Sequence, residues 1–137
     1  GEVMWEPHIP QASNEERQKI YHSMNETIAM LHSVDHESIG LETFGKPGNY
    51  VGRQVARWSK QYVASETREI KSMNNLMEWL PKNLPAEKAT KLVHGDFSLS
   101  NVMIDLKTFK ICAILDWELS TLGDPAADFS YHCIQYS

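Results

Sequence analysis

The sequence comprises 137 residues and has a net charge of −5 at neutral pH, from 13 basic and 18 acidic side chains. Its length fits one globular domain, and with 42% of its residues hydrophobic it can close a core. The acidic balance argues against a general nucleic-acid binder, which needs a basic surface to engage phosphates, and no apolar run is long enough to predict a transmembrane helix.

The cysteines and the first residues of the sequence indicate the cellular compartment in which we expect the protein. Cys112 and Cys133 lie in apolar sequence surroundings, which predicts reduced thiols in the core, with a disulfide between them as the alternative. No basic-then-apolar signal stretch opens the sequence. We therefore expect an intracellular protein, in the cytoplasm or in an organelle matrix.

The first part of the chain has the pattern of an amphipathic helix. Ser13 and Glu16 fit a capping box, which predicts a helix over residues 14–33. Its apolar positions recur at spacings of four and three: Ile20, Met24, Ile28 and Leu31. His32 and His36 have the spacing of two metal ligands on one helix face, but the helix is ending there, so we expect surface histidines.

Two further helices are predicted before the pattern changes. A loop over residues 45–49 leads into a second helix, over residues 49–64. A third helix starts near Ile70 and ends near Pro81, whose ring cannot continue a helix. We expect the aromatic and methionine side chains of these helices in the core rather than at a cofactor.

Beyond Pro85 the chain turns to short β-like runs, at residues 92–93, 101–104 and 110–115. The last two runs predict a hairpin that turns between Asp105 and Lys110. A final helix then opens with Asp124 as its N-cap and Pro125 at its first position.

Three oxygen-bearing side chains flank the predicted hairpin: Asp96, Asn101 and Asp116. Because a hairpin folds back on itself, it can bring residues 101 and 116 to the same end. Asn and Asp oxygens there suit a hard cation such as Mg²⁺, while Asp96 could face a substrate hydroxyl. The alternative is that these side chains only cap turns.

Three segments carry a family resemblance: His94-Gly95-Asp96 with Asn101 five residues later, Asp116-Trp117-Glu118, and Gly123-Asp124-Pro125-Ala126-Ala127-Asp128. In type and separation they resemble the aminoglycoside phosphotransferase family, relatives of choline kinases and protein kinases. The segments at residues 44–50 and 53–58 resemble the branch associated with acyl-CoA dehydrogenases. The resemblance implies an α+β fold, the C-lobe of a protein kinase-like structure, mainly helical with a small β-hairpin that carries the catalytic motifs.

The resemblance also implies roles for individual residues. Asp96 would be the catalytic base, and Asn101 and Asp116 would be ligands of Mg²⁺, with ATP as co-substrate. His94 would support the loop, and Asp128 would tie the loop backbone in place. For Glu118 two roles stay open, reaching a metal through water or forming a salt bridge.

The sequence also departs from the family pattern. Ser98 stands where many members have a histidine, and neither a glycine-rich phosphate loop nor the lysine of the nucleotide-binding lobe is found. We therefore expect residues 1–137 to be a hinge and most of a C-lobe, without the N-lobe and the C-terminal helices. Such a fragment is expected to be inactive alone, and to bind the N-lobe or a second copy through exposed apolar surface.

The function expected from these observations is ATP-dependent phosphorylation of a hydroxyl on a small molecule, with a hydroxyacyl compound as a candidate acceptor. The alternative is a pseudokinase-like or scaffolding module of a larger acyl-CoA dehydrogenase-linked protein. A protein kinase is disfavoured, because Gly95 replaces the arginine of the protein-kinase loop and no A-P-E segment follows Asp116.

Overall fold

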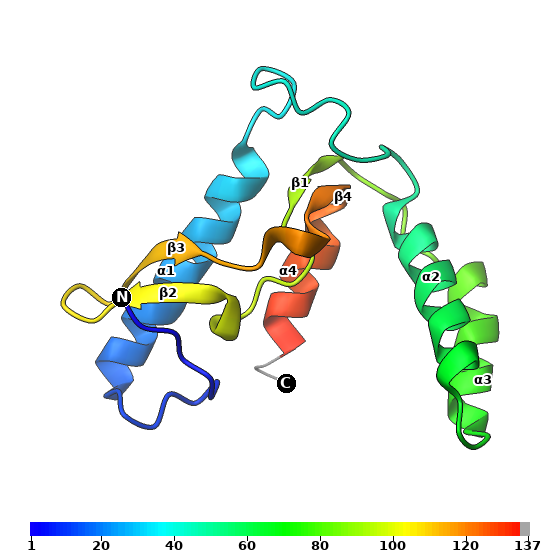
Figure 1. Ribbon diagram of the computed structural model, residues 1–137, viewed down its shortest axis with the longest axis horizontal. Coiled ribbons are helices and arrows are strands. Elements are labelled where there is room, and N and C mark those ends of the chain that lie inside the picture. Colours follow the sequence, from blue (N-terminus) through cyan, green and yellow to red (C-terminus); the bar gives the residue numbers. More distant parts are fainter. Residues whose placement is uncertain (135–137) are drawn as a thin grey trace.

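The computed structural model describes residues 1–134 and has the mixed α+β architecture that the sequence predicts (Figure 1). The helices are α1 (Asn14–Ser33), α2 (Tyr50–Ser65), α3 (Lys71–Trp79) and α4 (Pro125–Cys133). The strands are β1 (Lys91–Val93), β2 (Val102–Asp105), β3 (Lys110–Ile114) and β4 (Thr121–Gly123). They form two antiparallel pairs, β1 with β4 and β2 with β3. Within the described residues, no helix is both long and apolar enough to cross a bilayer.

Helix α1 begins with the predicted capping box. Glu16 N donates to Ser13 Oγ at 3.3 Å, and Ser13 N donates to Glu16 Oε2 at 2.7 Å, so two backbone donors of the first turn are satisfied. The predicted apolar stripe is buried and packs against β1 and β3: Ile20, Met24, Ile28 and Leu31. The core continues into the β2–β3 side of the molecule through Phe97 and Ile104, both fully buried.

The hairpin β2–β3 has the predicted geometry. Val102 pairs with Ile114, and Leu115 N donates to Asn101 O at 2.8 Å, so residues 101 and 116 lie at the same end of the hairpin. Side chains alternate between the two faces of a strand, and Cys112 falls on the exposed face of β3. The prediction of a core thiol is therefore wrong for Cys112.

The second cysteine, Cys133, is half-buried near the end of α4. Both thiols are free, so no disulfide joins them. The final helix has its predicted cap, because Ala126 N donates to Asp124 Oδ1 at 2.9 Å and Pro125 occupies the first turn. Strand β4, which pairs with β1, was not predicted, since three residues are too few to give an alternating pattern.

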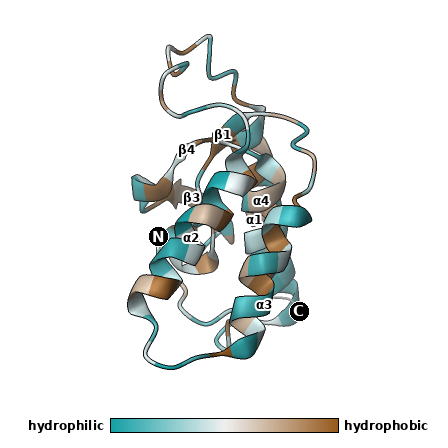
Figure 2. Ribbon diagram, turned by 90° about the vertical axis from the view of Figure 1, so that its right-hand side faces the viewer, coloured by the Kyte–Doolittle hydropathy of each residue, from teal (hydrophilic) through white to brown (hydrophobic). Residues whose placement is uncertain are grey.

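Helices α2 and α3 stand together at one side of the molecule, and the 3₁₀ turn Leu80–Lys82 after α3 packs on α2 (Figures 1 and 2). Apart from Tyr50 at the start of α2, which is buried, their apolar side chains do not enter the core as predicted. Trp58 is 51% exposed, Trp79 is 56% exposed, and no residue of α3 is buried. Hydropathy colouring shows hydrophobic residues on the outward sides of both helices (Figure 2). Amphipathic spacing identified the helices correctly. It could not show that nothing within residues 1–134 packs on their outward apolar side chains.

Candidate active site

The loop between β1 and β2 carries the predicted catalytic motif, and its conformation depends on Gly95. That residue has φ +86°, a region that side chains with a Cβ rarely adopt. A Cβ at this position would also lie 2.6 Å from the carbonyl oxygen of Leu119. The close approach of the loop to residue 119 therefore requires a glycine, and it fixes the path of the chain into Asp96.

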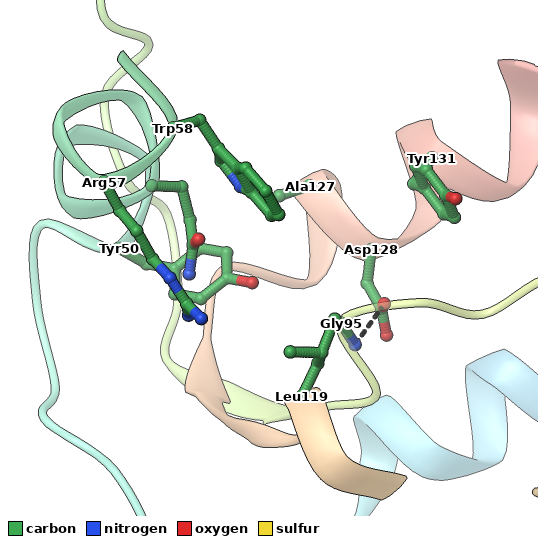
Figure 3. A pocket seen from close by; sticks show the side chains of 9 residues that line it. Tyr50, Arg57, Trp58, Gly95, Leu119, Ala127, Asp128 and Tyr131 are labelled. Atoms are coloured by element: carbon green, nitrogen blue, oxygen red, sulfur yellow. Dashed lines mark hydrogen bonds between the residues drawn. The ribbon is translucent and has the colours of Figure 1, made fainter. Parts of the chain in front are cut away.

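Asp128 of α4 holds the backbone of this loop through hydrogen bonds. Gly95 N donates to its Oδ1 at 2.9 Å (Figure 3). His94 N donates to its Oδ2 at 2.9 Å, and His32 Nε2 donates to the same oxygen at 3.0 Å. The carboxylate is only 4% exposed. Burial opposes its ionisation, but hydrogen bonds from these groups and the nearby His32 outweigh that cost and hold the pKa of Asp128 below its ordinary value.

His94 connects the loop to the end of the hairpin. Its fully buried ring accepts a hydrogen bond from Asp96 N at Nδ1, at 3.3 Å. Nε2 therefore carries the proton and donates to Leu115 O at 2.8 Å. One imidazole thus joins the backbone of Asp96 to the residue that precedes Asp116.

Asn101 bonds Asp96 through its amide group. Asn101 Nδ2 donates to the backbone oxygen of Asp96 at 2.8 Å and to Asp96 Oδ2 at 2.9 Å. Both protons of the amide nitrogen are used in this way, and among residues 1–134 nothing donates to its Oδ1. The amide oxygen remains available to a cation, while the amide nitrogen holds the carboxylate of Asp96.

Asp116 follows β3 in a left-handed conformation, with φ 60° and ψ 62°, and its side chain is exposed. Such a conformation is uncommon for a residue with a Cβ, and Asp is among the residues that adopt it most readily. Trp117 covers the turn: its indole nitrogen donates to Ile114 O at 3.0 Å, and its ring lies edge-on to that of His94, with 5.0 Å between the ring centres. Glu118 is exposed and forms no ion pair with any residue in the described part of the chain.

The oxygen ligands near the loop fit a magnesium ion that is also bound by phosphate oxygens. No group of three or more His, Cys, Asp or Glu side chains within residues 1–134 is arranged to hold a metal alone. The metal ligands available are the amide oxygen of Asn101 and the carboxylate of Asp116. Mg²⁺ is usually bound through one or two protein oxygens, with water and substrate phosphates completing its six ligands.

A cavity of about 170 Å³ lies beside the loop, between α2 and α4 (Figure 3). Tyr50, Arg57 and Trp58 of α2 face Asp128 and Tyr131 of α4 across it, with Gly95 and Leu119 below. The hydroxyl of Tyr131 reaches toward Asp96: hydrogen bonding to that carboxylate, then partial burial and the carboxylate's charge, raises the pKa of Tyr131. Gly95, the residue before Asp96, lines the cavity, so the cavity lies beside the loop that carries Asp96.

Comparison with known proteins identifies the family. The phosphotransferase enzyme family, APH, matches residues 1–137. The chain belongs to this family. A crystal structure of a candidate aminoglycoside phosphotransferase from Ralstonia eutropha JMP134 superposes with a TM-score of 0.92 at 51% identity, over 98% of this chain and 41% of that one.

Two mammalian relatives of this phosphotransferase-family chain carry the name of another enzyme. Acyl-CoA dehydrogenase family member 10 from Mus musculus is 46% identical, and acyl-CoA dehydrogenase family member 11 from Rattus norvegicus is 43% identical, each over 99% of this chain. The chain spans only 13% and 18% of their lengths. The resemblance to the acyl-CoA dehydrogenase-associated branch is thereby confirmed.

Sequence reasoning missed the contacts of two histidines near the loop, His32 with Asp128 and His132 with the ring of Phe97. His32 was expected at the surface, but its side chain is 15% exposed and bonds Asp128, 96 positions away. His132, which fits no sequence pattern, is buried, and its Nε2 lies 3.2 Å from Asn25 Oδ1. For His32 a signal existed, since it lies one turn after buried Ile28 and beside Leu31, at the border of the apolar stripe.

Proposed function

We propose that the protein containing this chain transfers the γ-phosphoryl group of ATP to a hydroxyl of a small molecule. The observation that carries the proposal is the pair of hydrogen bonds from Asn101 Nδ2 to Asp96, which holds the carboxylate and leaves the amide oxygen free. A carboxylate for the acceptor and neutral or anionic oxygens for a metal, side by side, is the division of labour that phosphoryl transfer requires.

The reaction can be written with these residues in place. Asp96 accepts the proton of the acceptor hydroxyl while the hydroxyl oxygen forms a bond to the γ-phosphorus. The bond from that phosphorus to the β–γ bridging oxygen breaks, and ADP leaves with the electron pair. Asn101 and Asp116 would hold Mg²⁺, which neutralises negative charge on the phosphates when bound. His94 and Asp128 keep the loop in position through the contacts described above.

For the acceptor we propose a hydroxyacyl compound rather than an antibiotic. Both mammalian relatives are named for acyl-CoA dehydrogenases, whose substrates are acyl thioesters. Aminoglycosides are polycations and need several unpaired carboxylates. Asp128 already accepts three hydrogen bonds, and Asp96 and Asp116 have other roles in the proposed reaction, so few carboxylates near the loop are left for a polycation.

A transfer assay tests this function. Full-length protein is incubated with γ-labelled ATP and one of four acceptors: a hydroxyacyl thioester, a hydroxy acid, an aminoglycoside or choline. We expect labelled hydroxyacyl product that disappears when EDTA removes Mg²⁺. Labelled aminoglycoside with no hydroxyacyl product would overturn the acceptor proposal. ATP binding without transfer to any acceptor would favour the pseudokinase-like or scaffolding alternative.

The assay uses full-length protein because we propose that residues 1–137 supply only the acceptor side and the metal side of the site. The chain covers 41% of the bacterial phosphotransferase structure that it matches. Groups that hold the adenine and the α- and β-phosphates are proposed to lie outside these residues. Transfer by residues 1–137 alone would contradict this division.

A further inference from the structure

Helix α2 is strongly basic in an acidic chain. It carries Arg53, Arg57 and Lys60 and no acidic residue, although the net charge of the whole chain is −5. A run of unbalanced positive charge on one helix, beside a cavity, attracts negatively charged ligands. A cation that lines the cavity and is free of ion pairs is the side chain best suited to bind such a ligand there.

The three cations differ in what they contact. Arg53 donates to the backbone oxygens of Lys46 and Gly48 and so clamps the loop before α2. Lys60 lies further along the helix and does not line the cavity. Arg57 lines the cavity, and within residues 1–134 no carboxylate lies at ion-pair distance from it.

The surroundings of Arg57 preorganise it for an anion. Its guanidinium carbon lies 5.7 Å from the centre of the Trp58 ring, a cation–π contact that restricts the side chain without neutralising it. Figure 3 shows Arg57 extending from α2 past Tyr50, with the Trp58 ring on the same side of the cavity. An unpaired guanidinium presents several donors in a fixed plane, which suits carboxylate and phosphate groups.

The opposite wall connects this cation to the proposed chemistry. Gly95 and Tyr131 line the same cavity, Gly95 precedes Asp96 in the chain, and the hydroxyl of Tyr131 interacts with the Asp96 carboxylate. Asp128, the acidic residue of the lining, accepts hydrogen bonds from His32 and from two backbone donors, which compensate part of its charge.

We propose that this cavity binds an anionic group of the acceptor, a carboxylate or a phosphate, through Arg57, while the acceptor hydroxyl meets Asp96. The inference rests on the proposed phosphotransferase function and adds the charge class of its substrate. Arg57 acts as a specificity residue that selects negatively charged hydroxy compounds. Trp58 and Tyr50 form the apolar walls for the carbon chain between the anionic group and the hydroxyl.

Steady-state kinetics of full-length protein test this with two matched acceptor pairs. For a carboxylate, the pair is 3-hydroxybutyrate and 3-hydroxybutyramide. For a phosphate, it is the 3-hydroxybutyryl thioester of coenzyme A and that of N-acetylcysteamine. Arg57→Gln is compared with Lys60→Gln, because each removes one positive charge from α2 but only Arg57 lines the cavity.

For at least one pair we expect wild-type protein to prefer the anionic member. Arg57→Gln should raise KM for that member about tenfold with little change in kcat, as for loss of a charge-assisted hydrogen bond. KM for the neutral member, and all values for Lys60→Gln, should stay within about twofold. The pair that responds identifies the anion.

Other outcomes overturn the proposal. Equal effects of Arg57→Gln on charged and neutral acceptors would show a merely structural role. Equal effects of Arg57→Gln and Lys60→Gln would show a general field of the helix. Wild-type preference for neutral acceptors would exclude an anion subsite. Absence of transfer to every acceptor would instead refute the phosphotransferase function itself. Titration with coenzyme A and with 3-hydroxybutyrate, followed by Trp fluorescence, would then test the anion subsite alone. Equal binding by wild-type and Arg57→Gln protein would contradict the subsite.

Discussion

His32 Nε2 lies 3.0 Å from Asp128 Oδ2, and this single contact joins the end of α1 to α4 across 96 positions of the sequence. The same carboxylate accepts hydrogen bonds from His94 N and Gly95 N. Two helices and the loop that carries Asp96 therefore share one buried anion. Stability and the geometry of the proposed active site should respond together when that anion is changed.

Replacement of the shared anion should destabilise the fold. Asp128→Asn puts an amide nitrogen, which cannot accept, in place of one carboxylate oxygen and faces it with a donor, so we expect a loss of about 2–4 kcal/mol in the free energy of unfolding. Urea denaturation measures the loss. Asp35→Asn makes the same chemical change at an exposed residue and should alter stability by less than about 0.5 kcal/mol. Similar values for the two variants would contradict the structural role.

The lowered pKa of Asp128 also predicts a pH dependence. A carboxyl group whose pKa is lower in the folded than in the unfolded protein stabilises the fold at pH values above its unfolded pKa, about 4. That contribution is lost as the pH falls through the folded pKa. Wild-type stability should therefore decline below about pH 4 more steeply than that of Asp128→Asn. Parallel declines in urea titrations over this range would count against the assignment.

Gly95→Ala should be far more harmful than the same change at another glycine with positive φ. Gly40 has φ +77°, and nothing lies within 4 Å of the place that an added methyl group would occupy, so Gly40→Ala should cost only the conformational strain, about 1–2 kcal/mol. At Gly95 the methyl group would also meet Leu119 O at 2.6 Å. In thermal unfolding, the Tm of Gly95→Ala should be clearly lower than that of Gly40→Ala. Equal losses would mean that the loop can move away from residue 119 at little cost.

Asp116 and Glu118 should differ in their effect on nucleotide binding. Asp116→Asn keeps a residue that tolerates the left-handed conformation but removes the charge, so affinity for Mg²⁺-bound ATP should fall about tenfold or more. Glu118→Gln removes a nearby exposed charge and should change affinity by less than about threefold. Calorimetric titration of full-length protein measures both. A larger effect at Glu118 would exchange the two assignments.

Local patterns in the sequence predicted local structure well. The capping box at Ser13, the hairpin that pairs Val102 with Ile114 and the cap at Asp124 are all present, because each depends on residues that are close in the chain. Contacts between distant elements were not accessible in this way. The bond between His32 and Asp128 depends on how α1 and α4 pack together.

In the candidate site, too, contacts between distant elements could not be predicted from the sequence. The motif spacing pointed to Asp96, Asn101 and Asp116, and the structure brings the first two into direct contact. Nothing in the spacing indicated Arg57 or Tyr131 as neighbours of the loop, because they come from α2 and α4. The exposure of Trp58 and Trp79 was mispredicted for a related reason, because nothing within residues 1–134 buries these two side chains of α2 and α3.

The most direct test of the account compares Asp96→Asn with Asp105→Asn in full-length protein, measuring turnover and ATP affinity together. Asp105 lies at the other end of the hairpin, where its carboxylate accepts a hydrogen bond from Lys107 N. Asp96→Asn should lower kcat by about 10²–10⁴-fold and leave ATP affinity within about twofold, because Asp96 acts on the acceptor hydroxyl. Asp105→Asn should keep both values near those of wild type. Near-normal turnover of Asp96→Asn would contradict the central claim.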